Sequence, residues 1–90
     1  MSKIVMYSTA MCPYCDRAER LLVRKGAAHA LEKVRVDTSP ERLAEMMRIT
    51  GRRTVPQIFI GDRHVGGFDD LVDLDMDGEL DTLLAGLTAD

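Results

Sequence analysis

The two cysteines of this 90-residue chain, Cys12 and Cys15, lie where the hydrophobic pattern changes its period. Residues 3–8 are an unbroken run of strand-forming residues, which predicts a strand buried on both faces. Apolar side chains recur at helical spacing over residues 13–25, and Pro13 suits a first helical position because its missing N–H would have no partner there. The motif therefore predicts an α/β fold with both sulfurs at a strand-to-helix junction.

The rest of the pattern continues this alternation and then changes to a hairpin. Ser39 and Pro40 have the residue types of a helix cap and a first helical position. The expected elements after the first helix are a strand over 30–37, a helix over 40–50, hairpin strands at 57–60 and 64–66, and helices after Gly67 and over 80–87. The order βαβα then ββα(α) predicts a four-stranded mixed sheet flanked by helices, in a single domain spanning residues 1–90.

The composition and the distribution of charge argue against a membrane protein and against a nucleic-acid-binding protein. No apolar run approaches the roughly 20 residues of a membrane span, and the N-terminus does not have the pattern of a signal peptide. We therefore expect a cytoplasmic protein that does not associate with a membrane. All 12 Lys and Arg lie in residues 1–64, whereas residues 65–90 hold eight acids and neither Lys nor Arg. One interpretation is that the acidic C-terminal part is simply a solvated face. The other is that the basic part of the chain frames a site for an anionic ligand. The sequence is not basic or aromatic enough to suggest nucleic-acid binding.

The motif itself predicts redox chemistry. At a helix N-terminus the macrodipole and unpaired backbone N–H groups favour a thiolate, and Cys-x-x-Cys motifs lower a thiol pKa to roughly 3.5–7.5. Cys12 should therefore be the nucleophile, and Cys15, one turn along and further inside, the resolving thiol. Zinc is the alternative, but a tetrahedral site needs four ligands, and His29 and His64 do not lie at zinc-like spacing. We expect no metal.

A second informative stretch is residues 52–57, where Pro56 directly precedes an apolar strand. A cis Val55–Pro56 bond at a tight turn would accommodate the proline and leave the Val55 N–H and C=O free to pair with an extended peptide. On the residues alone, a trans bond in a plain loop is the favoured alternative.

The third stretch is the segment Gly66-Gly67-Phe68-Asp69-Asp70. Two glycines permit close backbone approach, and the start of a helix binds carboxylates. The two aspartates would accept from an ammonium group or simply cap the helix. Together the three stretches fit a ligand with carboxylates, an ammonium group, a peptide-like middle and a sulfur, and glutathione has all of these.

In this order and spacing the motif Cys12-Pro13-Tyr14-Cys15, the turn Thr54-Val55-Pro56 and the segment at Gly66–Asp70 closely resemble a dithiol glutaredoxin of bacterial type. The resemblance runs from Lys3 to about Leu84. It implies a thioredoxin-like fold, a cis Val55–Pro56 bond, and a glutathione-dependent thiol-disulfide oxidoreductase that holds no permanent cofactor and uses glutathione as co-substrate.

The resemblance also assigns roles within a single glutaredoxin domain. Cys12 would carry a mixed disulfide with glutathione, and Arg53, with Gln57 as a second candidate, would face its glycyl carboxylate. The other residues implied to bind glutathione are Tyr14, Thr54, Val55, Pro56, Gly67, Phe68, Asp69 and Asp70. One position departs from the family, since Thr9 stands where many members carry a lysine, three residues before Cys12. Arg52 or Arg53 would have to supply that charge.

The implied partners are glutathione and proteins that carry a disulfide or a glutathionylated cysteine, with ribonucleotide reductase among the candidates, and we expect a monomer. Two alternatives stay open at this point. One is a thioredoxin-like reductant, against which Tyr14 and the glycine–aspartate segment argue. The other is a module that shares an iron–sulfur cluster between two subunits, which the stiff Pro13 disfavours.

Overall fold

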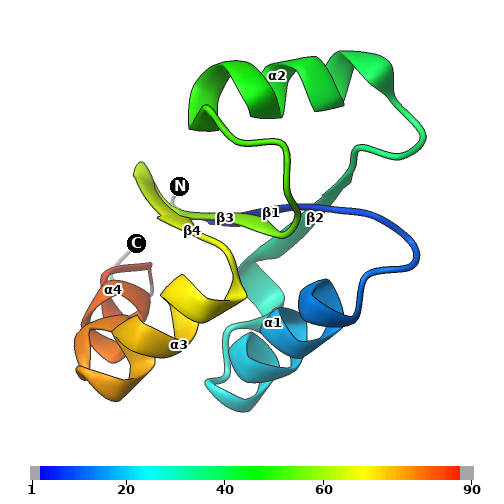
Figure 1. The fold of residues 1–90 in the computed structure, drawn as a ribbon. Coiled ribbons are helices and arrows are strands. Elements are labelled where there is room, and N and C mark those ends of the chain that lie inside the picture. Colours follow the sequence, from blue (N-terminus) through cyan, green and yellow to red (C-terminus); the bar gives the residue numbers. More distant parts are fainter. Residues whose placement is uncertain (1–2, 88–90) are drawn as a thin grey trace.

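The computed structural model describes residues 3–87, and its four strands form one mixed sheet in the order β2-β1-β3-β4 (Figure 1). The central strand β1 is parallel to β2 and antiparallel to β3, which in turn is antiparallel to β4. The strands are β1 (Ile4–Ser8), β2 (Leu31–Arg35), β3 (Gln57–Ile60) and β4 (Arg63–Gly66). This confirms the predicted mixed sheet and the hairpin.

Helices cover both faces of the sheet. Figure 1 shows α2 on one face and α1, α3 and α4 on the other. The helices are α1 (Pro13–Arg24), α2 (Pro40–Thr50), α3 (Phe68–Met76) and α4 (Glu79–Leu87), with a short 3-10 helix η1 (Ala28–Ala30) before β2. No helix within residues 3–87 is long and apolar enough to cross a membrane.

The buried side chains form two clusters, one on each face. The larger lies between the sheet and the three-helix face and includes Ile4, Met6, Leu22, Ile58 and Leu71, all with no exposed surface. The smaller lies under α2. Because β1 contributes to both clusters, it is buried on both faces, as its unbroken apolar run predicted.

The local signals place most element boundaries correctly. Ser39 caps α2 by accepting a hydrogen bond from the Arg42 N–H at 3.3 Å, and Pro40 is the first helical residue. Several expected boundaries differ from the structure by one or two residues. The second strand does not begin at Ala30, which belongs to η1, and it ends at Arg35 rather than at residue 37. The partner strand of the hairpin begins one residue early, at Arg63.

Candidate functional site

Cys12 is the N-cap residue of α1. Its backbone is extended, with φ −139° and ψ 96°, and Pro13 follows as the first helical residue. The Cys15 N–H, one of the first-turn donors without a helical acceptor, donates to Cys12 Sγ at 3.1 Å. The sequence-based expectation that a helix N-terminus would surround the first sulfur with backbone donors therefore matches the geometry.

The two cysteines form a disulfide, with their Cα atoms 5.2 Å apart. Cys12 retains 8% of its surface and Cys15 retains 4%. The order of exposure is the one expected for an outer attacking sulfur and an inner resolving sulfur. The structure therefore shows the oxidised form of a redox pair.

The loop before β3 lies beside Cys12. Cys12 Sγ is 3.9 Å from the carbonyl oxygen of Val55, and the Val55–Pro56 peptide bond is cis. A sulfur engaged in a disulfide has no proton to donate, so this is a contact and not a hydrogen bond. The cis bond agrees with the family resemblance and not with the trans alternative that the residues alone had favoured.

A groove lies next to this contact, with Val55 in its lining, and extends to α3. Its lining comes from three segments that are far apart in the sequence: the first turn of α1, the loop before β3, and the junction of β4 and α3. The lining residues are Tyr14, Arg52, Thr54, Val55, Pro56, Gln57, Gly67, Phe68, Asp69 and Asp70. All the predicted glutathione-binding residues except Arg53 are in this set, and Arg52 lines the groove where Arg53 was expected. The role of Arg53 stays a prediction.

The junction of β4 and α3 is held by one carboxylate. Asp70 Oδ2 accepts the Gly67 N–H at 2.9 Å, which caps α3, and pairs with Arg52 Nη1 at 3.3 Å. The Gly67 N–H and, after it, the Arg52 guanidinium hold the pKa of Asp70 below its ordinary value. Gly66 has φ 113°, and a Cβ built there would collide with the Asp70 carboxylate. Asp70 therefore both caps the helix and carries a lasting negative charge into the groove.

Tyr14 forms one wall of the groove although its side chain is 54% exposed. Its ring centroid lies 6.2 Å from that of Phe68, and Arg17 Cζ lies 5.4 Å from it on a cation–π contact. These two contacts help to fix the orientation of the ring. A flat aromatic surface is thus presented within two residues of Cys12.

A buried polar network behind the groove was not predicted from the sequence, which offered Gln57 only as a contact for the glycyl carboxylate. Gln57, 1% exposed, donates from Nε2 to the Thr54 carbonyl at 3.1 Å, and its Oε1 lies 2.8 Å from His64 Nε2. His64 stacks on Phe59 at 4.8 Å, and burial followed by the charge of Arg52 lowers its pKa. This network fixes the loop that carries Val55. The available signal was a glutamine at the head of an otherwise apolar strand.

Thr9 is not among the residues that line the groove. It lines a polar pocket with Cys15 and with two cations of β2, Lys33 and Arg35. Both cations have carboxylate partners, because Lys33 Nζ lies 3.0 Å from Glu19 and Arg35 Nε lies 2.6 Å from Asp37. Basic side chains therefore do surround this end of the motif, although they come from β2 rather than from position 9.

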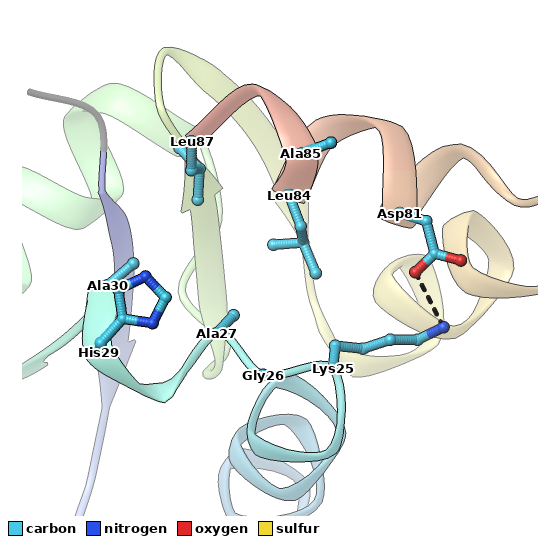
Figure 2. Close-up of a pocket in the computed structure, with 9 residues that line it drawn as sticks. All are labelled: Lys25, Gly26, Ala27, His29, Ala30, Asp81, Leu84, Ala85 and Leu87. Carbon is cyan, nitrogen blue, oxygen red and sulfur yellow. Dashed lines mark ion pairs between the residues drawn. The ribbon is translucent and has the colours of Figure 1, made fainter. Parts of the chain in front are cut away.

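A further pocket lies at the other end of α1, between its last turn, η1 and α4 (Figure 2). Lys25 crosses its edge and pairs with Asp81 at 3.0 Å, and His29 lines the opposite side. The 12 residues of α1, at about 1.5 Å each, place this pocket roughly 18 Å from Cys12. Within residues 3–87, no three His, Cys, Asp or Glu side chains gather in a way that could hold a metal ion.

Comparison with known proteins agrees with this site. The glutaredoxin family model matches residues 4–65. A glutaredoxin of Neisseria meningitidis serogroup A is 52% identical over 84 residues, which cover 93% of this chain and 98% of the relative. Glutaredoxin 3 of Escherichia coli K12 is 44% identical over 84 residues, which cover 93% of this chain and 99% of the relative.

A solved structure shows the same fold. The crystal structure of a buckwheat glutaredoxin–glutathione complex superposes with a TM-score of 0.85 at 32% identity, covering 94% of this chain and 78% of the other. The family match, the identities and the paired cysteines at the start of α1 lead to one conclusion. The chain belongs to the glutaredoxin family of thiol-disulfide oxidoreductases.

Proposed function

We propose that Cys12 is the nucleophile of a glutathione-dependent thiol-disulfide exchange and that the groove beside it binds glutathione. The observation that carries the proposal is the 3.9 Å contact between Cys12 Sγ and the Val55 carbonyl oxygen, which places the sulfur against the groove wall. A peptide-like ligand in the groove would therefore meet the reactive sulfur and an exposed strand-like edge together.

The parts of the groove suit the parts of glutathione. The Val55 backbone would pair with the cysteinyl unit, while Thr54 and Pro56 form the wall behind it. The first turn of α3 offers backbone N–H groups for the γ-glutamyl carboxylate. Asp69 and Asp70 would attract its ammonium group, and the low pKa of Asp70 keeps that charge at neutral pH.

The glycyl carboxylate, at the opposite end of the ligand, also needs a cation. Arg52 lines the groove but pairs with Asp70 at 3.3 Å, which places it nearer the γ-glutamyl end. Arg53, the next residue, is the cation implied by the family resemblance. Phe68, Gly67 and Tyr14 would cover the apolar middle of the ligand.

The proposed reaction proceeds by two exchanges at sulfur. The Cys12 thiolate attacks the glutathione sulfur of a mixed disulfide, so that Cys12–S–SG forms and the target thiol leaves as a thiolate. A glutathione thiolate then attacks the bound glutathione sulfur, which releases oxidised glutathione and restores the Cys12 thiolate. With a protein disulfide, Cys12 attacks first and Cys15 displaces the substrate by closing the Cys12–Cys15 disulfide.

The two cysteine variants test this assignment because each removes one sulfur from the same helix turn. Cys12→Ser should reduce glutathione-dependent turnover to the uncatalysed rate with every disulfide substrate, because a serine hydroxyl is not ionised at neutral pH. Cys15→Ser should retain turnover of glutathione mixed disulfides, since that route does not use the second sulfur. Turnover of a glutathionylated peptide by Cys12→Ser at the wild-type rate would refute the proposed function.

A further inference from the structure

We infer that Asp37 is a positioning residue for Cys12, acting through the backbone of the loop that joins β1 to α1. The inference rests on the proposed role of Cys12 as nucleophile. Asp37 follows β2, and its Oδ2 accepts the Ala10 N–H at 3.1 Å. Twenty-seven residues separate the two in sequence, so the contact exists only in the folded chain.

The loop has few other restraints. Four residues, 9–12, lead from the end of β1 to the first residue of α1, and the Met11 side chain within them is 92% exposed. An exposed side chain contributes little packing, so the loop is held mainly at its ends and at its backbone. The Ala10 N–H lies two residues before Cys12, where a shift of the backbone would move Cys12 Sγ relative to the Cys15 N–H.

Asp37 is itself fixed in orientation. Arg35 donates to both of its carboxylate oxygens, from Nε to Oδ1 at 2.6 Å and from Nη2 to Oδ2 at 2.7 Å. This fork geometry defines the plane of the carboxylate. The Val36 N–H donates to the Ser8 carbonyl at 2.9 Å and continues the β1–β2 pairing to the edge of the loop. The β1–β2 pairing and the two Arg35 hydrogen bonds thus orient the Asp37 carboxylate, and one of its oxygens accepts from Ala10.

The arginine pair also keeps the acceptor charged. The Arg35 guanidinium, with a smaller effect from the Ala10 N–H, holds the pKa of Asp37 well below its usual range. The carboxylate therefore accepts from Ala10 throughout the pH range in which a thiolate could form on Cys12. The groove and the pocket beside Thr9 share no lining residue, and Asp37 lines neither of them.

The test separates geometry from charge by comparing Asp37→Ala with Asp37→Asn. Both variants remove the negative charge, but asparagine keeps an oxygen that can accept the Ala10 N–H. Charge loss alone would change the Cys12 pKa equally in both. If Asp37 positions the loop, kcat/KM for a glutathionylated peptide falls about tenfold in Asp37→Ala, equivalent to one bond worth about 1.4 kcal/mol, and stays within about threefold in Asp37→Asn.

The second readout is the Cys12 pKa, measured by thiolate absorbance in a Cys15→Ser background that leaves one thiol. We expect a higher Cys12 pKa in Asp37→Ala than in Asp37→Asn. Glu32→Ala is the matched control, because Glu32 lies at the start of β2, the strand that Asp37 follows, and pairs with Lys3 at 2.6 Å. This variant should leave both readouts unchanged.

A third measurement does not depend on a variant that folds. In the wild-type protein the Ala10 amide should exchange with solvent at least about tenfold more slowly than the Met11 amide. Equal exchange of these two amides, or equal kcat/KM and equal Cys12 pKa in the two Asp37 variants, would overturn the inference. Both results leave the proposed function intact, which would fail only if Cys12→Ser kept its turnover.

Discussion

The two ends of α1 each lie beside a pocket, and the pockets differ in what lines them. At the N-terminal end, Cys12 Sγ accepts the Cys15 N–H and touches the wall of a groove at Val55. At the C-terminal end, Lys25 Nζ is already occupied by Asp75 at 2.6 Å and Asp81 at 3.0 Å (Figure 2). One end presents a sulfur that accepts a backbone N–H beside a groove, whereas the lysine at the other end is held in two ion pairs.

This difference shows that a hollow on the surface does not by itself mark a site. The groove at the N-terminal end lies beside a redox-active sulfur and contains the positive end of a helix and one fixed carboxylate. A ligand that has a thiol, a carboxylate and an ammonium group would find a partner for each of them there. The C-terminal pocket combines apolar side chains with a neutralised lysine. Changes at the first end should therefore alter catalysis, while matched changes near the second should alter stability alone.

The largest effect after loss of the nucleophile is expected for Gly66→Ala. The residue has φ 113°, and an added Cβ would also collide with the Asp70 carboxylate. Gly78→Ala is the matched control, since Gly78 has φ 79° at the α3–α4 junction but no atom within 4 Å of an added Cβ. Backbone strain should cost about 1–2 kcal/mol in each variant, and the collision about 1–3 kcal/mol more in Gly66→Ala.

Urea unfolding and glutathione kinetics distinguish the two variants. Both should unfold at lower urea than the wild type, and Gly66→Ala should also raise the KM for glutathione because Asp70 is displaced from the groove. An unchanged KM in Gly66→Ala, or an equal rise in Gly78→Ala, would remove the distinction between the two regions.

A moderate effect is expected for Asp70→Asn. The amide oxygen can still accept the Gly67 N–H, so the cap of α3 persists while the negative charge is lost. The KM for glutathione should rise about two- to fivefold, the range of a partly exposed charge pair, with little change in kcat. Asp75→Asn, which removes a charge from the other end of α3, should leave the KM unchanged. A KM for Asp70→Asn equal to that of the wild type would argue against Asp70 as a ligand contact.

Much of this arrangement could be predicted from local signals. The Cys12 cap and Pro13 follow from residues that are neighbours in the chain, as does the Ser39 cap of α2. The double glycine followed by Asp70 also predicted either a helix cap or a ligand contact, and the structure shows the cap. In each of these features the interacting residues are four or fewer positions apart in the sequence, so the backbone geometry of a helix start leaves few other partners for them.

The remainder depends on contacts that local sequence does not encode. Whether Arg52 or Arg53 faces the groove depends on how the loop before β3 packs on α3. The burial of Gln57 depends on His64 across the hairpin, and the Ala10–Asp37 bond depends on the parallel pairing of β1 with β2. The cis Val55–Pro56 bond required the family resemblance, because the residues alone had favoured trans.

The smallest expected effect is the pH dependence of the contribution that Asp70 makes to the free energy of unfolding. The pKa of Asp70 lies below its ordinary value of 3.8 in the folded protein, so its contribution to stability is fully present above that value and is lost as the pH falls through the folded pKa. The difference in unfolding free energy between the wild type and Asp70→Asn should therefore be constant from about pH 8 to pH 5 and shrink below about pH 4. Denaturant unfolding at each pH measures it, and a difference that grows with acidity would contradict the sign.

The central claim is that the sulfur at the N-cap of α1, beside the groove, is the one that receives glutathione. The most direct measurement is to react the reduced protein with a small excess of oxidised glutathione, quench with acid, and map the modified cysteine by peptide mass spectrometry. We expect glutathione on Cys12 in Cys15→Ser and no stable adduct on Cys15 in Cys12→Ser. Glutathione found on Cys15 in preference to Cys12 would contradict it.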